Sequence, residues 1–159
     1  MADFPLDPDQ GHANSNRTYI LLAFAREGLI AMDVQEASTA NDQMSADEQA
    51  ISTCVQRFYA MANDDSLLGP IFAEGITDWP EHLRQMSDFW SRVLLGSVRY
   101  QRDPFTPHHT LGLQAAHFDR WRDLFQLAAR ETLEGPLRER AVGAAAQMSH
   151  CWRQHMMAK

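Results

Sequence analysis

The sequence predicts an all-α fold, with one helical domain following an N-terminal extension. Apolar residues recur at helical spacing through most of residues 45–159, and no stretch shows the strict alternation that is typical of a strand. The 159 residues are 45% hydrophobic and 22% charged, which is ordinary for a globular protein. These observations predict about four main helices joined by short connections.

Residues 1–44 differ from the rest and are predicted to be an extension rather than part of the domain. Residues 1–16 are polar and contain two prolines, so we expect disorder there. Residues 18–35 are predicted to form a short helix interrupted at Gly28. An alternative hypothesis is that the reading frame is over-extended and that translation begins at Met32 or Met44.

Two helical pieces are expected first within the domain, residues 45–159. Ser45 and Glu48 have the spacing of a capping box, which predicts a helix start. The apolar positions of this helix are Ile51, Cys54, Val55, Phe58 and Ala62. Residues 63–65 are expected to end it, and Pro70 then suits the start of a short helical turn.

Three longer helices are expected in the rest of the domain. Asp78 is a predicted N-cap, and Gly96 is a predicted C-terminal stop for the same helix. Residues 97–107 read as a loop, and a short ordered piece follows at residues 108–113. The next helix carries Phe118, Trp121, Leu124, Phe125 and Ala128 and ends before Gly135-Pro136. The last helix runs from about Pro136 to Met156.

Charge and cysteine content restrict the partners that we expect. The net charge of −7 disfavours a general nucleic-acid surface. Two cysteines are too few for a disulfide framework, which fits a reducing compartment. The longest apolar run is far shorter than the ~20 residues of a membrane span, so no membrane role and a cytoplasmic location are expected. A monomer is favoured.

Common catalytic motifs are missing from the sequence. It contains no glycine-rich phosphate loop, no G-x-S-x-G and no H-E-x-x-H. It also contains no C-x-x-C-H, which excludes covalent attachment of a c-type haem. All four tryptophans and several single histidines lie after residue 50, and such residues on helices suit a planar apolar cofactor with one axial ligand.

Four sequence blocks together resemble a truncated haemoglobin, most closely of group III. The blocks are FYAMANDDSLLGPIF, DWPEHLRQMSDFWSRVLLG, DPFTPHHTL and HFDRWRDLF, and the resemblance covers roughly residues 48–156. It implies a shortened globin with helices in a two-over-two arrangement around haem b, iron protoporphyrin IX. The Gly-Gly pairs that are frequent in the other groups are missing here, which agrees with group III.

The resemblance implies that His108 is the proximal iron ligand. The family places this ligand three residues before a leucine, and Leu111 is three residues after His108. His109 is the rival, because any neutral imidazole can ligate haem iron. Without the flanking blocks, both histidines would read as solvent-exposed loop residues.

The resemblance also implies a distal side on which side chains contact the bound gas. Tyr59 and Trp121 match donors whose O–H and N–H stabilise an anionic ligand. His82 matches the distal histidine of the family, which suggests a gate, although an exposed helix histidine is an equal alternative. The alternative for Tyr59 is a core tyrosine with an incidental partner. Trp121 also lies on an apolar helix face, and its ring can pack there while its edge donates.

Other residues are expected to contact the cofactor without touching the gas. Met86 and Trp90 continue the helical face of His82 and would wall the pocket, while Phe58 would pack near the haem edge. Tyr100 and Leu111 complete the predicted cofactor-binding set. Arg99 or Arg102 is predicted to pair with a haem propionate. His117, His150 and His155 have no assigned role, and His117 is expected to be exposed.

The function implied is the binding of dioxygen or another diatomic gas at a haem iron. Donors on the distal side predict slow release, which suits nitric oxide dioxygenation or peroxide chemistry better than oxygen transport, but the sequence does not choose among these. No dinucleotide fingerprint is present, so either reaction would need an external electron donor. The alternative is a non-haem globin-like helical module for sensing or interaction.

Overall fold

The computed structural model describes residues 44–104 and 108–157, with side chains up to residue 155. The predicted extension at residues 1–44 therefore lies almost entirely outside the described residues, as does the helix expected at residues 18–35.

Helix α2 (Ala46–Asp64) begins at the predicted capping box. The Ser45 hydroxyl accepts the Glu48 N–H at 3.2 Å, and the Glu48 carboxylate accepts the Ser45 N–H at 3.0 Å. Two N–H groups that lack an intrahelical partner are thereby satisfied. The predicted apolar face is buried, and Tyr59 joins it with 8% of its surface exposed.

Helix α3 (Gly69–Gly75) follows α2 after a tight corner. A Cβ atom on Gly69 would lie 2.6 Å from the carbonyl oxygen of Asn63, so only glycine fits this close approach. Asp65 stabilises the same corner. Its Oδ1 accepts the N–H groups of Leu67 and Leu68 at 3.0 Å each, and its Oδ2 accepts the Arg120 guanidinium at 2.6 Å.

Helix α4 (Trp79–Leu95) has both of its predicted ends. Asp78 caps the first turn by accepting the Glu81 N–H at 3.1 Å. Gly96 ends the helix with φ at 74°, in the left-handed region where other residues are strained. One hydrogen bond holds the following loop against α4: the guanidinium of Arg92 donates to the carbonyl oxygen of Tyr100 at 2.9 Å.

Helices α5 (Ala115–Thr132) and α6 (Gly135–Met157) form an antiparallel pair joined by two residues. Small side chains let the two helices pack closely, and five alanines on them are fully buried: Ala128, Ala129, Ala141, Ala144 and Ala145. Helix α6 begins one residue before the predicted Pro136.

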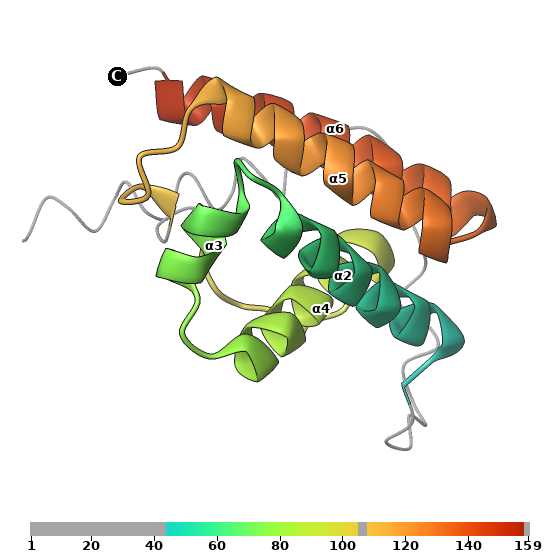
Figure 1. The fold of residues 1–159 in the computed structure, drawn as a ribbon. Helices are drawn as coiled ribbons and strands as arrows, with labels where there is room; N and C mark the ends of the chain where they lie inside the picture. Colours follow the sequence, from blue (N-terminus) through green and yellow to red (C-terminus); the bar gives the residue numbers. More distant parts are fainter. Residues whose placement is uncertain (1–43, 105–107, 158–159) are drawn as a thin grey trace, which may run out of the picture. The chain divides into compact units, whose positions relative to one another are not determined.

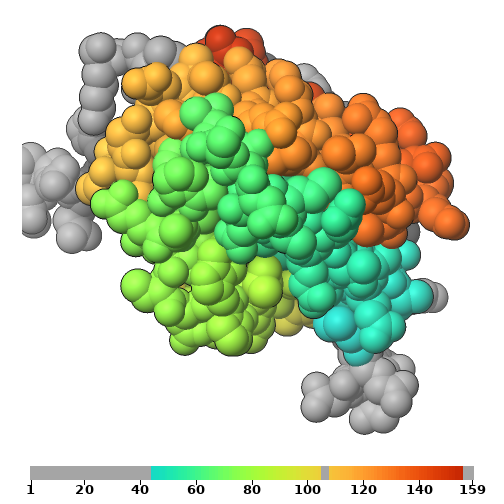
Figure 2. Space-filling model, viewed as in Figure 1, coloured from blue at the N-terminus to red at the C-terminus, as the bar shows by residue number. Residues whose placement is uncertain are grey.

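The α5 and α6 pair lies over a second pair formed by α2 and α4, with α3 at one end (Figure 1). Helix α2 contacts α3, α4 and α5, and the space-filling view shows its atoms packed directly against those of α5 (Figure 2). Every regular element within residues 44–104 and 108–157 is helical, which confirms the predicted fold class and the two-over-two arrangement. None of the described helices is long and apolar enough to cross a membrane.

Candidate functional site

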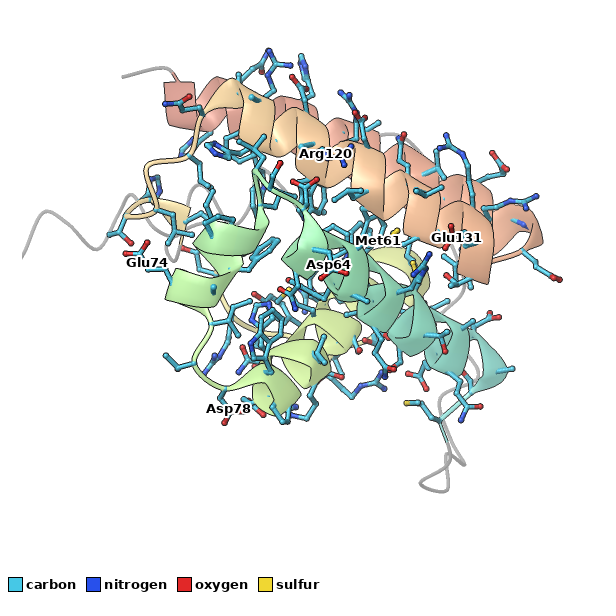
Figure 3. All side chains as sticks on the ribbon, in the orientation of Figure 1. Met61, Asp64, Glu74, Asp78, Arg120 and Glu131 are labelled. Atoms are coloured by element: carbon cyan, nitrogen blue, oxygen red, sulfur yellow. The ribbon has the colours of Figure 1, made fainter. Side chains whose placement is uncertain are left out.

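A cavity of about 360 Å³ lies between the helix pairs, where side chains from both pairs converge (Figure 3). Its volume falls within the roughly 300–1,000 Å³ of small-molecule sites. The described helices α2 to α6 and the loop between α4 and α5 all contribute to its mainly apolar wall. All nine predicted cofactor-binding residues line it: Phe58, Tyr59, His82, Met86, Trp90, Tyr100, His108, Leu111 and Trp121.

His108 enters the cavity wall from the loop that precedes α5. Its Nδ1 lies 2.7 Å from the carbonyl oxygen of Pro104. Because a carbonyl only accepts, Nδ1 carries the proton and the lone pair is on Nε2. Burial lowers the pKa of His108, which favours the neutral ring that a metal ion needs.

His109 has a different environment from His108. It is exposed, does not line the cavity, and lies with its ring centroid 5.7 Å from that of His155. The two adjacent histidines thus differ in position, and of the two only His108 can reach a ligand in the cavity.

Tyr59 and His82 form a polar pair in the wall of the cavity. The Tyr59 hydroxyl lies 2.7 Å from His82 Nε2. Burial raises the pKa of Tyr59 and lowers that of His82, so both groups are neutral near pH 7. The ring of Trp79 contacts both of them, with centroids at 5.7 Å and 6.1 Å respectively. His82 is half-buried rather than fully exposed.

Trp121 belongs to a group of aromatic rings that are almost parallel. Its ring lies within 15° of the planes of Trp90, Phe125 and Trp152, at centroid distances of 6.4, 5.7 and 6.3 Å. The Trp121 indole N–H has no hydrogen-bond partner among the described residues. It is therefore a donor that remains available to a molecule in the cavity.

Trp152 is a cavity residue that the sequence pattern does not predict. Its ring centroid lies 4.5 Å from that of His108, and it lines the cavity together with Met148, one helical turn earlier. That i, i+4 spacing on α6 is a signal that was present in the sequence, but it fits an ordinary core helix equally well.

The prediction that His117 is exposed is wrong. It is half-buried and lines the cavity, and its Nδ1 accepts the N–H of Gln114 at 2.8 Å. The ring therefore closes the first turn of α5 in place of an acidic capping residue. Of the two arginines considered for a propionate, Arg102 lines the cavity and Arg99 does not.

The chain was compared with known proteins by sequence and by structure. No family profile matches the chain. A group 3 truncated haemoglobin from Campylobacter jejuni is 31% identical over 84 residues, which cover 50% of this chain and 66% of that protein. In sequence, the chain is thus similar to a group III truncated haemoglobin. The aligned segment spans just under two thirds of this relative's length.

A solved structure agrees with the truncated globin fold. The crystal structure of a group III truncated haemoglobin from Campylobacter jejuni matches with a TM-score of 0.64 at 23% identity. The match covers 74% of this chain and 95% of that one. The resemblance described from the four sequence blocks is thereby confirmed at the level of the family and of the fold.

Proposed function

We propose that this protein binds haem b in the cavity, with His108 as the protein ligand to iron. The observation that carries the proposal is the bond from His108 Nδ1 to the Pro104 carbonyl oxygen at 2.7 Å. A backbone acceptor of this kind fixes the orientation of a ligating imidazole and increases the basicity of its other nitrogen. The mainly apolar wall of the cavity suits the flat body of the cofactor.

Haem iron with one protein ligand supplies a coordination position at which a diatomic gas binds. Tyr59 and Trp121 are the donors proposed to stabilise bound dioxygen, and His82 is the partner that holds the Tyr59 hydroxyl. Because a gas that takes electron density from the iron would carry partial negative charge, each donor would strengthen its binding. The function proposed is thus the slow-releasing binding of dioxygen or a related gas.

We further propose that the bound gas reacts, either in nitric oxide dioxygenation or in peroxide reduction. Both would draw electrons from a separate donor protein or small molecule. No residue is assigned as catalytic; Tyr59, Trp121 and His82 are the residues proposed to stabilise the gas, because they place a hydroxyl, an indole N–H and an imidazole in the mainly apolar wall.

The absorption spectrum of the purified protein tests haem binding directly. We expect a strong haem band that shifts when the reduced protein meets carbon monoxide. A colourless protein that also fails to take up added haem would overturn the proposal and leave the non-haem helical module as the better interpretation.

A matched pair of variants tests the ligand assignment. We expect His108→Ala to lose haem on a desalting column, because no other described histidine combines a backbone acceptor on Nδ1 with a place in the cavity wall. His109→Ala is the control and should keep a wild-type spectrum, since its ring faces His155 instead. The reverse result would make His109 the ligand.

A further inference from the structure

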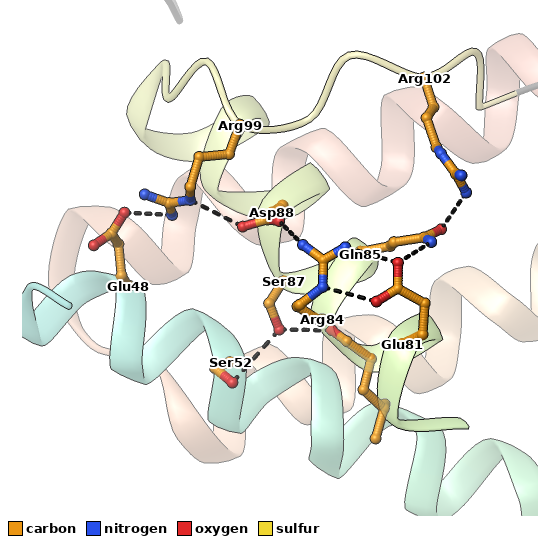
Figure 4. Close-up of polar contacts among 10 residues, drawn as sticks. Glu48, Ser52, Glu81, Arg84, Gln85, Ser87, Asp88, Arg99 and Arg102 are labelled. Atoms are coloured by element: carbon orange, nitrogen blue, oxygen red, sulfur yellow. Dashed lines mark hydrogen bonds and ion pairs between the residues drawn. The ribbon is translucent and has the colours of Figure 1, made fainter. Parts of the chain in front are cut away.

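The charged side chains of α4 and of the loop after it are paired with one another. Arg99 pairs with Glu48 and Asp88, and Arg84 pairs with Asp88 and Glu81 (Figure 4). Because a guanidinium already engages each of these carboxylates, this cluster is not open to a cation. A cluster of a different kind, made of histidines, lies elsewhere outside the cavity wall.

His109 and His155 lie side by side, although they are far apart in the chain. Their ring centroids are 5.7 Å apart, and the ring planes cross at 60°. His109 is exposed and His155 is half-buried, and neither lines the cavity. The pair is therefore accessible from solvent and is separate from the proposed haem site.

The spacing of these two rings fits two imidazoles that share one metal ion. A ligating imidazole nitrogen lies ~2.0–2.1 Å from a zinc ion, which puts the two ring centres roughly 5–6 Å apart at a tetrahedral or somewhat wider angle. The observed 5.7 Å falls within this range. Because the ring planes cross rather than stack, a nitrogen of each ring can turn toward a common point.

We propose that His109 and His155 form a surface site for a divalent transition-metal ion of the zinc, nickel or copper class. Imidazole suits these ions, whereas magnesium and calcium prefer oxygen ligands. Within residues 44–104 and 108–157, no group of three or more histidine, cysteine, aspartate or glutamate side chains is arranged to hold a metal ion. The protein thus supplies two ligands, water supplies the others, and the ion exchanges with solution.

An ion at this pair would join the loop before α5 to the last turns of α6. The same two segments already meet at neighbouring positions, where the ring centroid of His108 lies 4.5 Å from that of Trp152. His109 follows His108 directly, and His155 lies about one helical turn after Trp152. The ion would therefore hold the loop that carries His108 against α6.

Calorimetric titration of the full chain, without an affinity tag, with nickel chloride tests the site. We expect His109→Ala and His155→Ala each to weaken nickel binding by at least about ten-fold, because either change leaves a single imidazole. His150→Ala is the matched control and should bind as wild type does. His150 is an exposed histidine of the same helix, and at about 3.6 residues per turn it faces away from His155. Magnesium chloride should give no difference among the four proteins.

The double variant His109→Ala/His155→Ala distinguishes one shared ion from two separate ions. If both histidines hold the same ion, the double variant should lose one nickel ion per chain relative to wild type. Loss of two ions would overturn the shared site. Wild-type affinity in either single variant, or an equal loss in His150→Ala, would also overturn it.

Thermal melting followed by circular dichroism gives a second readout and confirms that each variant is folded. An ion that binds only the folded chain stabilises it, so saturating nickel should raise the melting temperature of wild type and of His150→Ala but not that of His109→Ala. A wild-type melting temperature that nickel leaves unchanged would contradict the proposal. Neither measurement needs haem, so a protein that fails to take up haem would overturn the proposed function and leave the nickel site standing.

Discussion

The hydroxyl of Tyr59 already has a partner before any gas enters the cavity. Its bond to His82 Nε2, at 2.7 Å, holds it in the wall and compensates for its burial. The direction of this bond is set by the tautomer of His82. With its proton on Nδ1, the imidazole accepts from the hydroxyl and competes with the gas. With its proton on Nε2, the imidazole donates to the hydroxyl oxygen and leaves the hydroxyl proton to the gas.

Replacing Tyr59 by phenylalanine removes that proton and should speed dioxygen release. A net contribution of about 1 kcal/mol per hydrogen bond corresponds to roughly a five-fold faster rate. Stopped-flow displacement of dioxygen measures it. An unchanged release rate in Tyr59→Phe would remove this hydroxyl from gas binding.

The corner between α2 and α3 is stabilised by one carboxylate, that of Asp65, which accepts hydrogen bonds from two backbone N–H groups and one guanidinium. Asp65 ends α2, binds two N–H groups ahead of α3 and pairs with Arg120 of α5, with only 7% of its side chain exposed. Burial opposes its ionisation, but Arg120 and the two N–H groups overcome this and lower the pKa of Asp65. The position of α3, and with it one wall of the cavity, follows from these bonds.

Asp65→Ala should lower the free energy of unfolding by about 1–3 kcal/mol, because it leaves three donors without their shared acceptor. Urea denaturation followed by circular dichroism measures the loss. Asp64→Ala changes the exposed residue beside it and should stay close to wild type (Figure 3). Equal stabilities of the two variants would show that the corner does not depend on Asp65.

The start of α4 should respond to acid through Glu81. The bonds from Arg84 and Gln85 lower the pKa of Glu81 in the folded protein to about 2 from the ordinary 4.5, so the unfolded chain binds a proton more readily. Stability from this residue is therefore complete above about pH 4.5 and is lost as the pH falls toward 2.

Thermal melting between pH 6 and pH 2 tests this sign. Glu81→Gln should flatten the acid side of the melting profile, whereas Glu74→Gln, at an exposed residue of α3, should leave it unchanged. A profile of wild-type steepness in Glu81→Gln would assign the acid sensitivity to other carboxylates.

At the scale of the whole domain, the helices of residues 44–104 and 108–157 pack through two unlike interfaces. Buried alanines bring α5 and α6 close together, while large aromatic rings separate that pair from α2 and α4. The first interface excludes all but the smallest side chains, and the second encloses the cavity.

Overpacking the alanine interface should therefore destabilise the fold. Ala144→Leu is expected to cost about 1–3 kcal/mol, because leucine cannot be placed there without moving a helix. Guanidinium denaturation gives the value, and Ala146→Leu, at an exposed position on α6, is the control. Wild-type stability in Ala144→Leu would mean that α6 can shift without loss.

The ends of the helices could be predicted from the sequence because their causes are local. Ser45, Asp78 and Gly96 act within one turn of their own positions, and all three act as predicted. Trp152 and His117 could not be placed at the cavity in the same way. Whether a helical residue faces the cavity depends on how α5 and α6 are rotated against the other pair, which residues far apart in the chain decide.

His108 and His109 illustrate the same limit at adjacent positions. The sequence pattern alone leaves two equivalent imidazoles, and the resemblance to a family ranks them. The contact with Pro104 and the place in the cavity wall distinguish them physically, and both depend on the path of the loop.

The four tryptophans give this protein a built-in optical reporter. Trp90, Trp121 and Trp152 line the cavity, and Trp79 touches the rings of Tyr59 and His82. Every indole that emits ultraviolet light thus stands beside the place proposed for a strongly absorbing pigment. The fluorescence of all four tryptophans should fall as the pigment binds. Its recovery would measure the rate at which the pigment dissociates, without any added dye.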